Sequence, residues 1–369
     1  MASTRPSEVS DDQIVVAPCS SVDRVEQAQL YAACFKKPLP ERGLSWRYDD
    51  VPFGPSVSLV ARPPNGTAIS GYACSPRRAV AAGAESSIAL VGETGDVMTH
   101  PEWRKRGFFS RLDRAALEAA RQRGWALAFG LPNRRSAHIF VELGWERIGS
   151  VRSWTCVLRA DAAARDVRAR EGRIAGWTTP FAARKAARAR RALEAARSAF
   201  RVASVEHFDE RAEQLSRAVE PRFSFMLRRD ARYLNWRFLQ APSRLHRAWG
   251  MYEGEQLAGY VVVQLPRDGA RLGHLVDVLG RDERAVAAAI GVGLAELERA
   301  GASVVQATAI DGSWWSTHLR GVGFVPPRSD NHLSVILRAL DAAHPLVAAA
   351  RDCTHWYFTD GDRDDETVG

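Results

Sequence analysis

The order of apolar and polar positions is most informative in the first third of the chain. Gly95-Asp96-Val97-Met98 is typical of the end of a strand, and Pro101 stops it, because proline cannot donate to a strand ladder. From Phe108 onward apolar residues recur at helical spacing, at positions 108, 112, 115, 116 and 119, and charged residues take the opposite face. Gly124 is a helix stop, and residues 125–129 are a short apolar strand. The pattern predicts a strand, a turn, a helix and a strand, which is an α/β unit.

The same pattern occurs twice along the chain. Five short matches keep their order and a separation of about 180 to 190 residues, as internal repeats do. They pair Leu44–Tyr48 with Leu234–Phe238, Gly71–Ala73 with Gly259–Val261, Asp96–Met98 with Asp277–Leu279, Gly124 with Gly301, and Leu143–Trp145 with Val322–Phe324. We therefore expect two copies of one α/β domain, with Trp46 and Trp236 as matched core residues.

The repeats divide the 369 residues into five expected parts. They are a disordered N-terminus (1–12), a first domain (13–160), an Ala/Arg-rich helical linker (161–205), a second domain (206–345) and a C-terminal tail (346–369). The linker favours helix over Phe181–Phe200, which carries six basic residues and one acidic residue, a net +5. The acidic segment Asp360–Glu366 is expected to fray.

Composition narrows the class of protein. The five cysteines are scattered with no CxxC pair, which favours a reducing cytoplasm over a disulfide framework. No apolar run is long enough to span a bilayer. The acidic tail departs from a calcium loop, because Asp365 stands where that loop needs glycine, so no metal is expected. The net charge of +8 suits any anionic partner and selects none.

A basic turn separates the predicted strand from the predicted helix. It reads Arg104-Lys105-Arg106-Gly107-Phe108-Phe109-Ser110. The first amides of a helix have no internal partners and carry partial positive charge, so such a terminus binds phosphate. Gly107 would let a ligand approach the backbone, and the three basic side chains would add charged contacts. The turn is neither a Walker loop nor a dinucleotide fingerprint.

Two motifs at the right distance resemble those of the GCN5-related N-acetyltransferase (GNAT) superfamily. Its pyrophosphate loop, [Q/R]-x-x-G-x-[G/A], is matched by Arg104, Gly107 and Phe109, of which Phe109 departs from the pattern. Its later element, N-x-x-A-x-x-x-Y-x-x-x-G-F, is matched by Asn133, Ser136, Phe140, Gly144 and Trp145. The resemblance implies an α/β fold of two tandem GNAT-like domains, each with a mixed central sheet flanked by helices.

The resemblance also implies a site for acetyl-CoA or another acyl-CoA as the donor substrate. Its binding residues would be Val97, Met98, Arg104, Lys105, Arg106, Gly107, Phe108, Phe109, Ser110, Asn133 and Ser136. In the second copy the corresponding turn, 281–286, has no glycine and carries two carboxylates that would repel phosphate. We therefore expect a single acyl-CoA site, in the first copy.

Acyl transfer to an amine needs a polarised thioester carbonyl, a base and a departing thiolate. By the resemblance, the backbone amide of Met98 or Val97 polarises the carbonyl. Asp96 and His138 are the first candidates for the base. The family tyrosine that protonates the thiolate is replaced by Phe140. Either another group protonates the thiolate or coenzyme A leaves unaided, since a thiol pKa near 8.5 makes the thiolate a tolerable leaving group.

Three interpretations of function remain open. The first is a cytoplasmic N-acyltransferase for the primary amine of a small molecule, such as an amino sugar or a natural-product amine. The second is a transferase that takes amino acids from charged tRNA, with the basic segment 181–200 on nucleic acid. The basic turn argues against it, because that donor needs no pyrophosphate cradle. The third is an acyl-CoA-binding protein that has lost catalysis.

Overall fold

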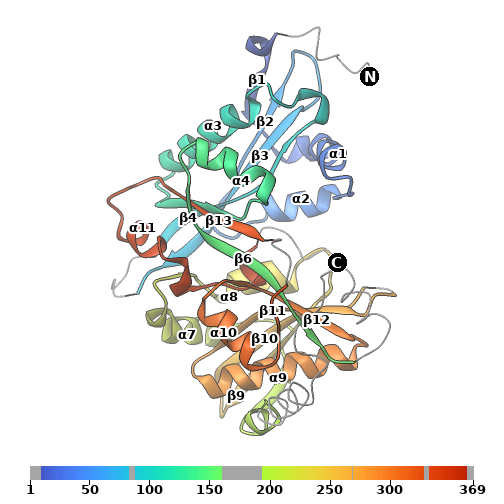
Figure 1. The fold of residues 1–369 in the computed structure, drawn as a ribbon, viewed down its shortest axis with the longest axis vertical. Helices are drawn as coiled ribbons and strands as arrows, with labels where there is room; N and C mark the ends of the chain where they lie inside the picture. The colour runs from blue at the N-terminus through green and yellow to red at the C-terminus, as the bar shows by residue number, and fades with distance from the viewer. Residues whose placement is uncertain (1–9, 83–87, 160–192, 268, 328–331, 364–369) are drawn as a thin grey trace.

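The computed structural model describes residues 10–82, 88–159, 193–267, 269–327 and 332–363. The first copy comprises β1 to β6 (Figure 1). Its strands and helices are β1 (Val15–Pro18), α1 (Arg24–Phe35), α2 (Glu41–Tyr48), β2 (Val57–Arg62), β3 (Ser70–Val80), β4 (Ala89–Thr99), α3 (Phe108–Gln122), β5 (Leu127–Gly130), α4 (Arg134–Glu142) and β6 (Glu146–Val157). Short 3-10 turns lie at Asp11–Gln13, Ser21–Asp23 and Pro101–Trp103.

The second copy repeats this order from β7 to β13 and is followed by a C-terminal segment. Its elements are β7 (Arg201–Ser204), α7 (Glu210–Val219), β8 (Phe225–Leu227), α8 (Ala231–Leu234), β9 (His246–Glu253), β10 (Gln256–Gln264), β11 (Leu272–Gly280), α9 (Glu283–Arg299), β12 (Val304–Ile310), α10 (Trp314–Gly321) and β13 (Leu333–Ala339). The π turn Asn235–Leu239 continues α8. The C-terminal segment contains α11 (Pro345–Ala350), β14 (Trp356–Tyr357) and the 3-10 turn η8 (Asp360–Asp362).

One continuous sheet runs through both copies. Its strand order is β1-β2-β3-β4-β5-β13-β6-β12-β11-β10-β9-β7, with β8 attached to β3 and β14. The order is the same from both ends: β1 to β5 and β13 correspond to β7, β9, β10, β11, β12 and β6. The copies are therefore related by a pseudo-two-fold axis between β13 and β6. The predicted α/β class and the two copies are confirmed, but the two sheets are fused into one.

The fusion rests on an exchange of last strands. Strand β6 belongs to the first copy but pairs with β12, from Val151–Ile310 to Val157–Val304. Strand β13 belongs to the second copy but pairs with β5, from Ala339–Leu127 to Ile336–Gly130. In Figure 1 the green β6 reaches down into the orange second copy, and the red-orange β13 lies in the upper half. The expected ranges 13–160 and 206–345 therefore do not enclose two separate sheets.

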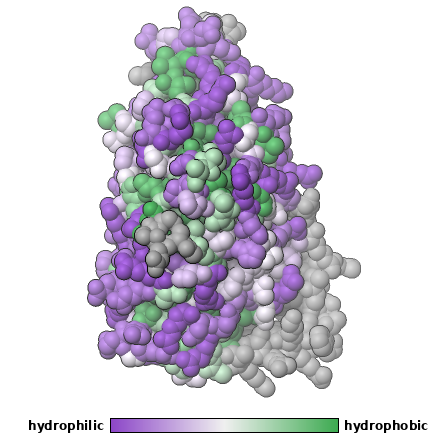
Figure 2. Space-filling model, turned by 90° about the vertical axis from the view of Figure 1, so that its left-hand side faces the viewer, coloured by the Kyte–Doolittle hydropathy of each residue, from purple (hydrophilic) through white to green (hydrophobic). Residues whose placement is uncertain are grey.

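Helices cover both faces of the sheet in each copy. In the first copy Leu59 packs in the cluster under α3, whereas its neighbour Val60 packs with Leu30 of α1, as alternation along a strand requires. In the second copy Val261 packs with α9 and Val262 with α7. On the face shown in Figure 2, small apolar groups are scattered among polar residues. Within the described ranges, no helix is both long and apolar enough to cross a membrane.

The matched tryptophans lie at the junction of the copies. Trp46 and Trp236 stack with ring centroids 5.1 Å apart. The indole N–H of Trp46 donates to the carbonyl of Trp236 at 3.0 Å, and that of Trp236 donates to the carbonyl of Trp46 at 3.1 Å. Both residues are buried. The expectation that they are core anchors is confirmed, and the reciprocal pairing shows that they bind each other across the pseudo-two-fold axis.

Three expectations about the ends and the linker need correction where the structure describes them. Asp11, in the segment expected to be disordered, has its carbonyl and its carboxylate bound by Arg111 and Arg106. In the expected linker, residues 201–204 form strand β7, while most of Phe181–Phe200 lies outside the described residues. In the expected tail, Asp360 and Asp362 are buried rather than frayed. Asp11 and Asp362 are held by the distant Arg106 and Arg229, and Asp360 accepts from the distant amide of Thr308.

Candidate active site

The central feature of the first copy is the place where β4 and β5 part. Strand β5 pairs with β4 only over Gly92–Thr94, opposite Ala128–Gly130. Strand β4 continues to Thr99 and keeps its partner β3 on the other side. Among the described residues, no strand pairs with that edge of β4 beyond Thr94. Backbone groups on this edge are therefore open to a ligand.

A β-bulge distorts β4 at this point. The register with β3 shifts between Gly71 and Ala73, so that Tyr72 faces both Asp96 and Val97. Asp96 has a φ of +46°, which few residues other than glycine adopt. The bulge is followed by Met98, whose side chain is buried with Leu30 under α1. Strained backbone of this kind concentrates at functional sites, and it re-aims the amides of 96 to 98.

The carboxylate of Asp96 is held by two residues of α2. Oδ2 accepts a hydrogen bond from Nη1 of Arg47 at 2.9 Å and another from the hydroxyl of Tyr48. The Arg47 and Asp96 side chains are largely buried. Within the described residues, Oδ1 of Asp96 accepts no hydrogen bond from the protein. Asp96 is thus fixed in position with one oxygen left for an incoming group.

The N-terminus of α3 has the form that the sequence predicts for an anion site. Gly107 is the N-cap with a φ of +77°, and no side chain of the described residues caps the first amides. A Cβ built on Gly107 would meet none of their atoms within 4 Å. Lys105 is also left-handed, with a φ of +64°. Alternating left-handed residues make a concave row of amides that suits phosphate.

The basic side chains of the turn are divided between two tasks. Arg104 and Lys105 are exposed, and Nε of Arg104 donates to the carbonyl of Thr99 at 3.2 Å. Arg106, by contrast, pairs with Asp11 and stacks on the ring of Trp103 at 4.8 Å. Phe108 is 1% exposed in the core, so only its backbone amide can face a ligand. The structure thus commits Arg106 and the Phe108 ring to packing rather than to the contacts expected of them.

The two departures from the family pattern touch each other. The rings of Phe109 and Phe140 meet edge to face with centroids 5.0 Å apart, and Phe140 meets Trp145 in the same way at 5.2 Å. Beneath them Asp113 accepts from the hydroxyl of Tyr72 at 2.8 Å and from the indole of Trp145 at 3.2 Å. Burial raises the pKa of the Asp113 carboxyl, and these two hydrogen bonds oppose that rise. The paired phenylalanines form an apolar wall between α3 and α4.

The second motif forms the start of α4. Oδ1 of Asn133 accepts from the amides of Arg135 at 2.9 Å and Ser136 at 3.2 Å, which makes Asn133 the N-cap. His138 lies exposed on α4, and no hydrogen bond within the described residues joins it to Asp96 or Met98. The structure therefore brings Asp96 and Met98 together on β4 and leaves His138 apart from them.

Sequence reasoning gave little weight to a buried carboxylate on the same strand. Glu93 is 3% exposed and pairs with Arg77 at 2.6 Å. Burial raises the pKa of Glu93, against the pull of the Arg77 guanidinium. Arg77 in turn lies over the ring of Trp236 at 4.9 Å, so the pair joins β4 to the junction of the copies. The sequence signal was a glutamate in an otherwise apolar strand run.

In the second copy the matching helix terminus is already filled. Asp282 caps α9 by accepting from the amide of Ala285 at 2.8 Å. Arg281 and Arg284, which flank it, are both paired with Glu253. This terminus is thus capped by a carboxylate and flanked by paired arginines, unlike the terminus of α3.

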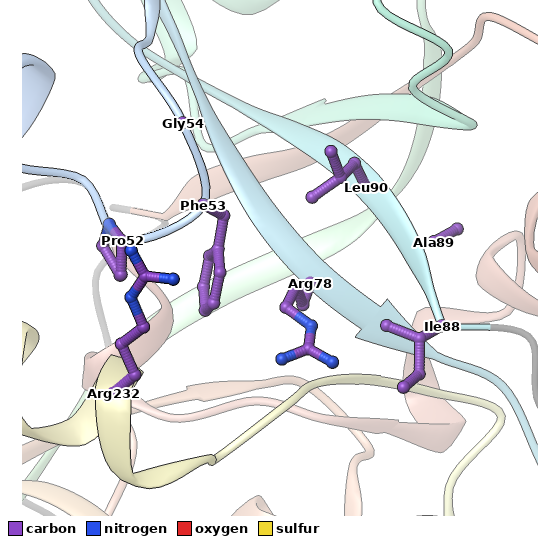
Figure 3. Close-up of a pocket in the computed structure, with 8 residues that line it drawn as sticks. All are labelled: Pro52, Phe53, Gly54, Arg78, Ile88, Ala89, Leu90 and Arg232. Atoms are coloured by element: carbon purple, nitrogen blue, oxygen red, sulfur yellow. The ribbon is translucent and has the colours of Figure 1, made fainter.

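One hollow at the junction, of about 550 Å³, lies away from this site. It is lined by Phe53, Arg78, Arg232 and residues 88–90, where β4 begins. Figure 3 shows the two guanidinium groups on either side of the Phe53 ring. Seven strand residues separate Ala89 from Asp96, about 23 Å at 3.3 Å per residue. This hollow is too far from the bulge to serve it. In the described part of the chain, no three His, Cys, Asp or Glu side chains gather to hold a metal ion.

Comparison with known proteins agrees with this geometry. Residues 17–148 match the model of the acetyltransferase (GNAT) domain family. No curated protein matches the sequence. The fold is similar to GCN5-related N-acetyltransferases from Kribbella flavida (18% identity, TM-score 0.59, 89% of this chain and 71% of that one) and Anabaena variabilis (13%, 0.60, 89% and 73%). It is also similar to a tandem GNAT protein from the clavulanic acid biosynthesis pathway (14%, 0.56, 90% and 100%). Residues 17–148 therefore match an acetyltransferase (GNAT) domain, and the fold of the whole chain is similar to that of a tandem GNAT protein.

Proposed function

We propose that the chain transfers an acetyl or longer acyl group from acyl-CoA to the primary amine of a small molecule, at the bulge of β4. The observation that carries the proposal is the uncapped, glycine-led terminus of α3 beside the open edge of β4. An amide-lined terminus suits the diphosphate of coenzyme A, and the open edge suits its amide-bearing arm.

The donor fits the residues around the turn. The amides of Phe108 to Ser110 would hold the pyrophosphate, because no side chain occupies them. Exposed Arg104 and Lys105 would add charge at the rim. The open space beside Gly107 is what a phosphate approaching the backbone requires. Asn133 and Ser136 would border the donor through α4.

The acceptor would enter from the side of α1 and α2. Asp96 points to that side, where Arg47 and Tyr48 hold one of its oxygens. Its free Oδ1 would orient the acceptor ammonium and accept its proton. The amine then attacks the thioester carbon, the developing oxyanion is stabilised by the amide of Met98 or Val97, and the carbon–sulfur bond breaks. His138 is the second candidate for the base, although its exposed position favours Asp96.

Phe140 determines how the thiolate leaves. Its ring is buried between Phe109 and Trp145 and has no proton to give. The thiolate therefore departs unprotonated and is neutralised in water, which its pKa of about 8.5 permits near neutral pH.

The proposal is tested by binding and by turnover. Acetyl-CoA and longer acyl-CoAs are titrated by calorimetry at up to ~100 μM, within the usual enzyme range. Thiol release is then followed with a panel of amines, in the wild type and in Asp96→Asn. We expect binding of one acyl-CoA per chain and thiol release that depends on one class of amine and on Asp96. Absence of binding would refute the proposal. Binding without thiol release across the panel would favour the non-catalytic interpretation.

A further inference from the structure

The C-terminal segment is built into the second copy. Thr359, Asp360 and Asp362 are each at most 2% exposed. The 3-10 turn η8 contacts both β11 and β12. Strands β11 and β12 pair only over Leu272–His274 and Val304–Gln306, so they part beyond this point as β4 and β5 do. The segment lies where β11 and β12 diverge.

Backbone and side chains tie the segment to both strands. The carboxylate of Asp360 accepts the amide hydrogen of Thr308 on β12 at 2.6 Å. The hydroxyl of Thr359 donates to Asp277 on β11 at 2.6 Å. The side of β12 that faces this divergence is therefore bonded to the segment, and so is Asp277 of β11, the strand that corresponds to β4.

A buried arginine anchors the same segment. Arg229 has no exposed surface and pairs with Asp277 at 3.1 Å and with Asp362 at 2.7 Å. Its Nη2 also donates to the hydroxyl of Thr359. A buried guanidinium is costly unless its hydrogens are bonded. Here the C-terminal segment provides the second carboxylate that Arg229 needs.

The pseudo-two-fold axis places this segment opposite the first copy's site. Arg47 and Arg237 occupy matched positions beside the paired tryptophans. Arg47 binds Asp96, at the parting of β4 and β5. Arg237 instead donates to the carbonyls of Gly361 at 3.2 Å and Arg363 at 2.7 Å. The segment thus lies beside Asp277, the counterpart of Asp96, where β11 and β12 diverge.

We propose that Thr359–Arg363, the C-terminal plug, is a built-in peptide ligand of the cleft between β11 and β12, and that it closes the second copy to acyl-CoA. The cleft is a peptide-binding site whose occupant is this chain's own end. The fit is close, because a Cβ on Gly361 would lie 2.9 Å from the ring of Phe238 and 3.3 Å from Asp277. The proposal rests on the proposed function only in taking the first copy's cleft as the donor cleft.

Hydrogen exchange of the full-length protein tests the plug without any ligand. In the wild type the amide hydrogens of Thr308 and of residues 359–362 should exchange as slowly as the amide hydrogens of the core strands. Gly361→Ala should accelerate both groups together by about fivefold to about a hundredfold, the effect of overpacking a tight site. Gly321→Ala is the matched control, because a Cβ there meets no atom within 4 Å. Fast exchange of 359–362 in the wild type, or equal exchange in the two variants, would overturn the plug.

Counting acyl-CoA sites tests the closure separately. Mass spectrometry under native conditions should find one acyl-CoA per wild-type chain and a smaller bound fraction in Gly107→Asp. A second acyl-CoA on the wild type would overturn the closure while leaving the proposed function intact. Absence of any acyl-CoA from the wild type would refute the proposed function, and the exchange experiment would still decide whether the plug exists.

Discussion

Replacing Gly107 with aspartate separates anion binding from backbone strain. Gly107 and Gly124 stand at opposite ends of α3, with φ values of +77° and +73°. A Cβ at either position meets no atom within 4 Å. Aspartate therefore meets the same left-handed backbone and the same open space at both ends. Only at Gly107 would its carboxylate face the diphosphate of coenzyme A.

The magnitudes follow from these two facts. A left-handed backbone costs a non-glycine residue about 1 kcal/mol, and this cost applies equally to both variants. A carboxylate about 4 Å from one phosphate charge opposes it by about 1 kcal/mol in water and about 4 kcal/mol at an effective dielectric constant of 20. Since 1.4 kcal/mol is a factor of ten, Gly107→Asp should weaken acyl-CoA binding by about fivefold to about a thousandfold. Gly124→Asp should leave the affinity unchanged.

Calorimetric titration of the two variants and of Gly107→Asn gives the assay. The neutral asparagine tolerates the left-handed backbone and should lose far less affinity than aspartate. The penalty for aspartate should shrink as salt rises, because the screening length is about 8 Å at 0.15 M. Thermal unfolding should show no greater loss of stability for Gly107→Asp than for Gly124→Asp, because the helix dipole favours a carboxylate at the N-terminus. Equal acyl-CoA affinity for Gly107→Asp and Gly124→Asp would show that the diphosphate does not bind at this terminus.

Three other outcomes concern the reactive centre and the second copy. Tyr48→Phe removes the hydroxyl that donates to Asp96 and keeps the ring. Turnover should therefore fall about tenfold or more with little change in Tm. Unchanged thiol release would contradict the role of Asp96. Wild-type rates should show no tyrosine-type fall near pH 10, because Phe140 carries no hydroxyl, whereas Phe140→Tyr should add a descending limb at about that pH. Burial lowers the pKa of His246 in the folded protein to about 3. In the unfolded chain its pKa is about 6.5, so between pH 6.5 and 3 the unfolded chain binds a proton that the folded chain does not. The free energy of unfolding should therefore fall by up to about 1.4 kcal/mol per pH unit between 6.5 and 3, and a His246→Gln variant with the same acid slope would refute this.

Features that depend on a short stretch of chain were predictable from the sequence. The helix from Phe108 follows from apolar spacing, and the cap at Asn133 follows from its place before a helical run. The matched tryptophans followed from the repeat, although their mutual hydrogen bonds did not. Local pattern therefore located the main parts of the candidate site.

Features that depend on distant partners were not predictable. Arg106 is paired with Asp11, nearly a hundred positions away, and nothing local marks it as unavailable to phosphate. The acidic segment from Asp360 was expected in water because carboxylates prefer water. It is buried because Arg229 lies opposite Asp362, 133 positions earlier in the chain. The partner that reverses a local preference is visible only in the fold.

The exchange of β6 and β13 governs how the protein can be made. As the chain leaves the ribosome, β5 is complete at Gly130, but its neighbour begins only at Leu333. Until then β5 presents an unpaired edge, which is prone to aggregation, and such long-range pairing folds slowly. Neither copy should fold stably when it is expressed alone. When the two copies are expressed together as separate chains, they should exchange β6 and β13 and fold as one complex. The sheet of the first copy therefore cannot be completed until β13 has been synthesised.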